Sequence, residues 1–145
     1  MIRCIIIEDE EKSLRVVQNL IQKYFDDRLK IQGNAASVEQ GIELIKTINP
    51  DLIFLDIELV DGSSFSILKQ FSHPKFSVIF TTAFDNYAIK AFKFSAIDYL
   101  LKPIDDDEFQ EAVHKYIQSR THNLDQAENI SNAEAIYHSP KDIYN

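Results

Sequence analysis

Apolar and polar residues follow one another along the chain in a pattern that predicts strands and helices in strict succession. Short apolar runs predict strands, and stretches with apolar residues three or four positions apart predict helices. The expected strands are 2–7, 29–33, 52–55, 77–82 and 96–101, and the expected helices are 11–25, 37–48, 63–71, 86–94 and 105–118. From residue 119 the pattern stops, so we expect one domain over residues 1–120 and a linker or tail over 121–145.

Strict alternation of strands and helices is typical of an α/β protein, in which helices cover both faces of a parallel sheet. The expected strand 29–33 has the mixed polarity of an edge strand, and the strand 96–101 is less apolar than the first and third. We therefore predict a flavodoxin-like, doubly wound sheet of five parallel strands in the order 2-1-3-4-5, with five helices. In this order the first and third strands are neighbours, and a crevice opens at their carboxyl ends.

Net charge and cysteine content argue against several kinds of binding site in this chain. The formal net charge of −8 argues against nucleic-acid binding by this chain itself, because phosphate backbones require a basic surface. The single cysteine, Cys4, lies in an apolar run, which predicts a buried structural thiol rather than a disulfide or a thiolate metal site. No apolar run is long enough for a membrane helix, so we expect a cytoplasmic protein without membrane contact.

Polar residues follow the expected strands at the points where they end. Glu8 and Asp9 follow the first strand, Asp56 the third and Lys102 the fifth, while Thr82 ends the fourth. The carboxyl ends of parallel strands lie at one edge of the sheet, so these residues are expected to converge. Their convergence, rather than any one residue, is the sign of a functional site.

Carboxylates gathered in one crevice repel one another. A like-charge pair at about 4 Å costs on the order of 4 kcal/mol at an effective dielectric constant near 20. A divalent cation relieves this repulsion, and Mg²⁺ suits oxygen ligands beside a phosphate. Together with Lys102 and a threonine hydroxyl, Mg²⁺ would stabilise phosphoryl transfer to a carboxylate. Asp56 is the expected nucleophile because it follows a central strand.

Four segments carry a resemblance to a known family. They read IIIEDE, LIFLDIEL, FTTA and IDYLLKP. With these motifs, about residues 1–120 resemble the response-regulator receiver domain of two-component signalling. The stretch TTAFDNYAIKAFKFSAIDYLLKPID further resembles receivers of LytTR-type regulators, the LytR/AlgR family.

The resemblance implies an acidic metal site. Asp56 takes the phosphoacceptor position, and Glu8 and Asp9 take the positions of the acidic pair. In the family, residues matching Asp9 and Asp56 hold Mg²⁺ together with a backbone carbonyl, here that of Glu58.

The resemblance also implies a conformational switch. Thr82 takes the position of the switch hydroxyl, Lys102 that of the phosphoryl-contacting lysine, and Tyr99 that of the switch aromatic residue. Thr81 is expected to be structural. Pro103 matches a family proline that follows a cis peptide bond.

The partners are implied in the same way. A sensor histidine kinase is expected to donate the phosphoryl group, and the chain is expected to catalyse only its own phosphorylation and dephosphorylation. We expect a homodimer through the face of the fourth helix, fifth strand and fifth helix. DNA would be bound only through an output domain outside this sequence, in transcription regulation.

The loop after Asp56 departs from the family pattern. Val60 and Ser64 stand where proline and glycine are common, and Gly62 is expected to provide the turn instead. Glu58 adds an acid two residues after Asp56. This acid-x-acid spacing leaves a Mg²⁺-dependent phosphatase of the haloacid-dehalogenase type as an alternative, although that family places the pair after the first strand. A receiver-like fold used only for protein contacts is the other alternative.

Overall fold

A five-stranded parallel sheet forms the centre of the protein. The structure is a computed structural model that describes the backbone of residues 1–132 and the side chains of residues 1–121. The strands run in the order β2-β1-β3-β6-β7, and all neighbouring pairs are parallel. Their bounds are β1 Ile2–Ile7, β2 Leu29–Ala35, β3 Leu52–Leu55, β6 Ser77–Thr82 and β7 Asp98–Leu101. This order is the predicted 2-1-3-4-5 with the strands renumbered, so the predicted flavodoxin-like fold is confirmed.

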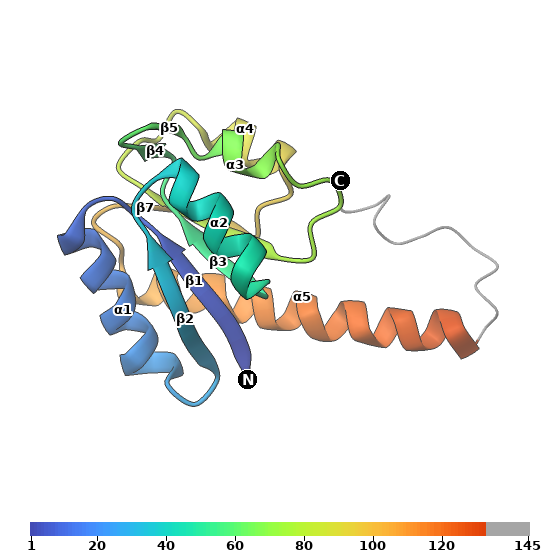
Figure 1. Ribbon diagram of the computed structural model, residues 1–145. Coiled ribbons are helices and arrows are strands. Elements are labelled where there is room, and N and C mark those ends of the chain that lie inside the picture. Colours follow the sequence, from blue (N-terminus) through green and yellow to red (C-terminus); the bar gives the residue numbers. More distant parts are fainter. Residues whose placement is uncertain (133–145) are drawn as a thin grey trace.

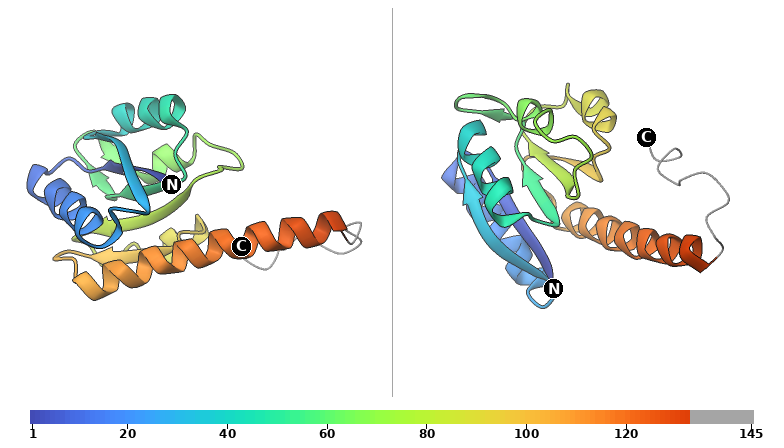
Figure 2. Two further views of the ribbon diagram at one scale, coloured as in Figure 1. Left: turned by 90° about the horizontal axis from the view of Figure 1, so that it is seen from below. Right: turned by 45° about the vertical axis from the view of Figure 1, so that its right-hand side comes forward.

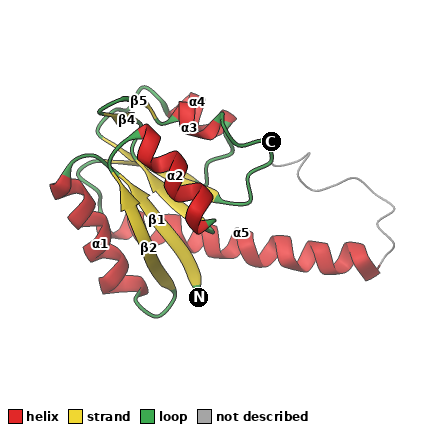
Figure 3. Ribbon diagram, in the orientation of Figure 1, coloured by secondary structure: helices red, strands yellow, loops and turns green. Residues whose placement is uncertain are grey.

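Helices cover both faces of the sheet (Figures 1 and 3). One face carries α1 and α5, and the other carries α2, α3 and α4. The bounds of the helices are α1 Glu11–Phe25, α2 Val38–Ile48, α3 Phe65–Leu68, α4 Ala88–Lys93 and α5 Asp106–Asn132. Within residues 1–132, none of the helices has the length and the apolar content that a membrane crossing needs.

The central strands are buried on both sides, which is why their sequences are almost continuously apolar. In β1, Cys4 and Ile6 pack under α1 and α5, whereas Ile5 and Ile7 pack under α2 and α3. Cys4 is fully buried, as predicted, and burial raises the pKa of its thiol to about 12. The thiol is therefore a core group and not a nucleophile.

The last helix is longer than the sequence pattern predicted. Its first part packs on the sheet through Phe109, Val113 and Tyr116, and Phe109 stacks on Phe54 with a ring-centroid distance of 5.5 Å. The helix then continues past the predicted end at residue 118 to Asn132 and projects beyond the sheet (Figure 2). No glycine or proline interrupts residues 119–132, so nothing in the sequence ends the helix at the edge of the core. Residues 133–145 of the predicted tail lie outside the described residues.

A small hairpin follows β3 and was not predicted as such. It consists of β4 (Glu58–Leu59) and β5 (Gly62–Ser63), joined by a tight turn. Because the hairpin takes up Ser63, α3 begins later than predicted, at Phe65. The turn does use Gly62, as expected, and its φ of 146° is a conformation that residues with a side chain rarely adopt.

Candidate functional site

Three carboxylates meet at the carboxyl edge of the sheet. β1 and β3 are hydrogen-bonded neighbours with Ile7 opposite Leu55, so the residues that follow them lie side by side. The backbone N–H of Asp56 donates to the Ile7 carbonyl at 3.0 Å, which extends this ladder into the site. Oxygens of Glu8, Asp9 and Asp56 all lie within 4.8 Å of one another. The predicted convergence of the two strand ends is thus present in the structure.

Lys102 reaches the same cluster from β7. Its Nζ lies 2.7 Å from Glu8 Oε1 and donates to Asp56 Oδ2 at 3.2 Å. The Lys102 backbone N–H donates to the Thr82 carbonyl at 2.8 Å, which keeps the chain beside β6 just past the strand. The following peptide bond, to Pro103, is cis, as the resemblance implied. One ammonium group therefore contacts two carboxylates.

Burial and charge act against each other in this cluster. Glu8 is only 3% exposed, and burial raises the pKa of its carboxyl group to about 7, although the Lys102 ammonium acts to lower it. The charge of Asp56 raises the pKa of Glu8 further. Burial alone would lower the pKa of Lys102, but the hydrogen bond to Glu8 and the charge of Asp56 outweigh it and raise that pKa. A neutral Glu8 is thus accessible near physiological pH.

The cluster fits a hard divalent cation. All of its candidate ligands are carboxylate oxygens, which Mg²⁺ prefers. Asp9 is exposed, whereas Asp56 is 6% exposed and Glu8 is buried, so the solvent side of the cluster opens at Asp9. A cation there would offset the repulsion that a single lysine leaves among three acids.

Thr82 and Tyr99 are connected through the backbone of Phe84. Thr82 is fully buried, and its Oγ1 accepts a hydrogen bond from the Phe84 N–H at 3.3 Å. The half-buried Tyr99 donates its hydroxyl hydrogen to the Phe84 carbonyl. A movement of the Thr82 hydroxyl would therefore disturb the Phe84 backbone, to which the Tyr99 hydroxyl is also bound. Thr81 is also buried, and within the described part of the chain its hydroxyl has no hydrogen-bond partner.

The loop after Asp56 places Glu58 apart from the other acids. The Glu58 side chain is exposed and accepts a hydrogen bond from the Tyr87 hydroxyl at 3.1 Å, just before α4. Val60 is 78% exposed at the tip of the hairpin, and Ser64 is buried, with its N–H donating to the Ile57 carbonyl at 2.7 Å. The loop is thus folded into a hairpin closed by the Ser64–Ile57 hydrogen bond, although Val60 and Ser64 replace the proline and glycine that are common in the family.

Three contacts of this region were not anticipated from the sequence. The Tyr87–Glu58 bond and the bridging role of Phe84 leave no signal in the sequence, because they depend on how distant loops pack. Asp61 in the hairpin also contacts α2. Its position before Gly62 is a turn signal that could have drawn attention to it.

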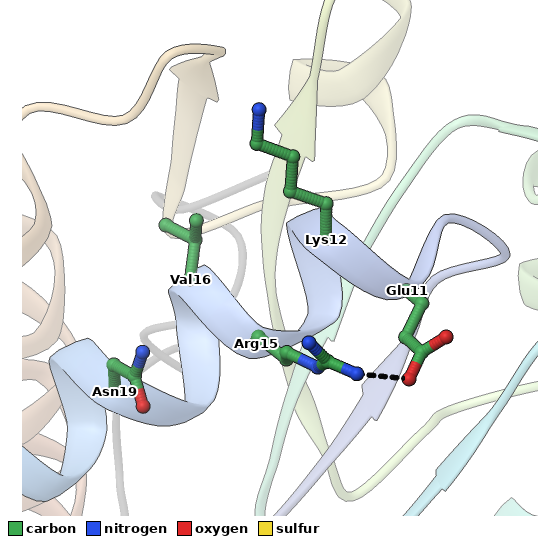
Figure 4. A pocket seen from close by; sticks show the side chains of 5 residues that line it. All are labelled: Glu11, Lys12, Arg15, Val16 and Asn19. Atoms are coloured by element: carbon green, nitrogen blue, oxygen red, sulfur yellow. Dashed lines mark hydrogen bonds and ion pairs between the residues drawn. The ribbon is translucent and has the colours of Figure 1, made fainter.

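A separate open hollow lies on the surface of α1 (Figure 4). It is lined by Glu11, Lys12, Arg15, Val16 and Asn19. Arg15 pairs with Glu11 one helical turn away, and both side chains are well exposed. None of the clustered carboxylates lines this hollow, so the chemistry of the site resides at the edge of the sheet.

Curated proteins of known name are similar in sequence to this chain. A curated relative, the sensory transduction protein LytT of Bacillus anthracis, is 31% identical over 137 residues, which are 92% of this chain and 54% of the relative. The transcriptional regulatory protein BtsR of Escherichia coli K12 is 33% identical over 123 residues, 83% of this chain and 50% of the relative. The chain therefore spans about half the length of these curated relatives.

Solved structures share its fold. The crystal structure of the response regulatory domain of protein mrkE from Klebsiella pneumoniae superposes with a TM-score of 0.72 at 26% identity, covering 81% of this chain and 96% of that one. The family model of the response regulator receiver domain matches residues 4–139. The chain therefore belongs to the response regulator receiver domain family of two-component signalling.

Proposed function

We propose that the chain is a phosphorylation-dependent switch that accepts a phosphoryl group on Asp56 from a sensor histidine kinase. The observation that carries the proposal is the cluster of Glu8, Asp9 and Asp56 within 4.8 Å, with Lys102 in contact with two of its members. Receiver domains are signalling phosphoacceptors, and this chain has the charged groups that such a transfer requires.

The proposed transfer is a single displacement at phosphorus. A carboxylate oxygen of Asp56 forms the new O–P bond while the P–N bond of the kinase phosphohistidine breaks, and the imidazole leaves with the electron pair. Lys102 contacts the phosphoryl oxygens, and the Thr82 hydroxyl donates a hydrogen bond to one of them after transfer. The charge that the phosphoryl group adds, roughly −1.5 to −2, is what these two residues respond to.

Asp9, Asp56 and the backbone carbonyl of Glu58 are the proposed Mg²⁺ ligands, with Glu8 beside them. Bound Mg²⁺ would neutralise charge on the acids and on the transferring group. The fit rests on the oxygen-only cluster and on the buried Glu8, whose pKa is raised mainly by burial and further by the charge of Asp56.

The hydrogen bonds of Phe84 suggest how the signal leaves the site. If Thr82 Oγ1 turns to the phosphoryl group, the Phe84 N–H loses its present acceptor, and the loop that also binds the Tyr99 hydroxyl can shift. The two arrangements differ by local hydrogen bonds, so phosphorylation would bias an existing equilibrium.

We propose that phosphorylation changes the binding of this chain to a second copy of itself. Large apolar side chains are exposed on α4 and β7, where Ile89 is 77% exposed, Phe92 64% and Leu101 45%. Basic Lys90 and Lys93 on α4 and the acidic start of α5 add charges of both signs, which suit a reciprocal two-fold contact.

The output would lie in a part of the protein beyond this sequence. LytT and BtsR, by their names, act in sensory transduction and transcriptional regulation, and the matched region is about half of each. We propose a LytTR-type DNA-binding output domain, because the acidic chain itself is unsuited to DNA. The domain limits of 1–120 and 121–145 and the cytoplasmic location remain predictions.

The position of Glu58 disfavours the phosphatase alternative. An acid-x-acid phosphatase needs both carboxylates at the reacting phosphorus, whereas the Glu58 side chain is bound to Tyr87 and is not a member of the acidic cluster. That alternative predicts repeated turnover of an aryl phosphate. A phosphoacceptor holds at most one phosphoryl group per chain at any time.

Beryllofluoride, a mimic of the phosphoryl group, tests the proposal without depending on hydrolysis rates. Fluorine NMR should show protein-bound resonances in the presence of Mg²⁺, and these should vanish with EDTA and in Asp56→Asn. Bound resonances that persist in Asp56→Asn, or none in the wild-type protein, would contradict the proposal.

A further inference from the structure

The hairpin after Asp56 is attached to helix α2 by one side chain. Asp61, at the hairpin turn, accepts two backbone hydrogen bonds from the first turn of α2: Val38 N–H donates to Oδ1 at 2.7 Å, and Glu39 N–H donates to Oδ2 at 3.2 Å. The N–H group of Val38 is the main cause of a lowered pKa of Asp61, so the carboxylate is ionised at neutral pH. The contact joins segments that are more than twenty residues apart in sequence.

Helix α2 has a cap of its own and does not depend on Asp61 alone. Ser37 is its N-cap residue, and the Ser37 Oγ accepts from Gln40 N–H at 3.1 Å. The Gln40 side chain in turn accepts from the Ala36 N–H at 3.0 Å, so a second hydrogen bond links the first turn of α2 to the residue before its N-cap. Asp61 therefore fixes the hairpin to a helix end that is already capped.

The hairpin has other attachments along its two short strands, where the Glu58 side chain also accepts a hydrogen bond from the Tyr87 hydroxyl at 3.1 Å. Ser64 N–H donates to the Ile57 carbonyl, and Leu59 is 8% exposed against the core. Between these points the chain turns through the exposed Val60 and through Gly62. Asp61 is thus the polar contact that holds the tip, while Glu58 lies between the tip and Asp56.

We propose that Asp61 is a positioning residue for the metal site. By holding the hairpin tip on α2, it restricts the backbone of the hairpin, and with it the Glu58 carbonyl that is the proposed Mg²⁺ ligand. The inference rests on the proposed function, in which that carbonyl is a Mg²⁺ ligand. Residues that orient metal ligands without touching the metal raise affinity because the ligands need not be ordered on binding.

The test compares two ways of weakening the same helix end. Asp61→Ala removes both hydrogen bonds to the hairpin, whereas Ser37→Ala removes a cap of α2 and leaves the hairpin intact. Calorimetric titration of the unphosphorylated chain with Mg²⁺ gives the dissociation constant, and hydrogen exchange without Mg²⁺ reports order at the Leu59 and Ser64 amides. Asp56→Asn serves as the control for the proposed metal site itself.

Asp61→Ala is expected to weaken Mg²⁺ binding about tenfold and to speed exchange in the hairpin, with Ser37→Ala within about twofold of wild type. Asp61→Asn keeps one acceptor and should give an intermediate loss, which preserves the test if the alanine variant fails to fold. Equal losses in Asp61→Ala and Ser37→Ala, or wild-type affinity in the Asp61 variants, would overturn the inference. Absence of Mg²⁺ binding by the wild-type chain, or full binding by Asp56→Asn, would instead refute the proposed function beneath it.

Discussion

Glu8 and Lys102 show how a buried site can hold excess acid. The lysine contacts Glu8 at 2.7 Å and Asp56 at 3.2 Å, yet one positive charge cannot balance three carboxylates. The pKa of Glu8 is raised mainly because its carboxyl group is buried, and the charge of Asp56 raises it further. A proton on Glu8 and a cation in the cluster are therefore alternative ways to neutralise the site.

Because a proton on Glu8 can neutralise the site when no cation is bound, the free energy of unfolding should depend on pH. The pKa of Glu8 is raised in the folded protein from 4.5 to about 7, so the folded state binds more protons than the unfolded state between these values. Stability without Mg²⁺ should be greatest below pH 4.5 as far as Glu8 is concerned, and it should fall as pH rises through about 7. The loss should be at most about 3 kcal/mol, since one pKa unit corresponds to about 1.36 kcal/mol.

Urea unfolding from pH 5 to 8 measures this change, with Glu8→Gln as the control. The variant keeps the size of the side chain and all histidines, so the difference between the two curves isolates Glu8. Saturating Mg²⁺ should flatten the wild-type curve, because a cation favours the carboxylate form. Parallel curves for wild type and variant would show that Glu8 does not titrate in this range.

Sequence reasoning succeeded for residues placed by the backbone. Asp56 and Lys102 follow apolar strands, and the order of those strands is enough to bring them together. It failed for Tyr87 and Asp61, whose partners lie 29 and 23 residues away and are chosen by loop packing. Glu58 was recognised as an added acid, but only the structure shows that its side chain binds Tyr87.

At the scale of elements, α5 joins the sheet through aromatic packing. Phe109 is fully buried, lies 5.5 Å from Phe54 and 6.1 Å from Phe25 between ring centroids, and so connects α5 with both β3 and α1. Phe92 on α4 is also a phenylalanine, but its side chain is 64% exposed to solvent. The two phenylalanines form a matched pair for a measurement of stability.

Phe109→Ala should lower the free energy of unfolding by about 3–5 kcal/mol, because it removes buried surface and leaves a cavity. Phe92→Ala should change it by less than about 0.5 kcal/mol, because its side chain already lies in water. Urea denaturation of both variants checks the prediction. Equal losses would mean that α5 does not pack on the sheet as described.

The spacing of apolar residues predicted some helices and strands well and others poorly. Long amphipathic or fully apolar segments, such as Glu11–Phe25 and Leu52–Leu55, were predicted with their exact bounds. The short α3 and the hairpin before it were not, because two-residue strands are too brief to show a period. The end of α5 was also missed, since polar residues continue a helix without an apolar stripe.

For the whole molecule, the exposed apolar residues of α4 and β7 are proposed to associate on activation. Beryllofluoride with Mg²⁺ should convert a monomer into a dimer in sedimentation velocity runs. Ile89→Asp should prevent this by placing a charge among the exposed apolar side chains, with little effect on folding because Ile89 is itself 77% exposed. Val16→Asp, on α1 in the lining of the hollow of Figure 4, is the control and should still dimerise. Dimerisation of Ile89→Asp, or no change in wild type, would exclude this face.

Transfer to Asp56 itself is the most direct test of the account. The chain is incubated with Mg²⁺ and acetyl phosphate, and the intact mass is read, with Asp56→Asn and EDTA as controls. We predict a gain of one phosphoryl group in the wild-type protein and none in either control. An equal gain in Asp56→Asn would place the chemistry on another residue. No gain in the wild type, together with no beryllofluoride binding, would contradict a phosphoacceptor role.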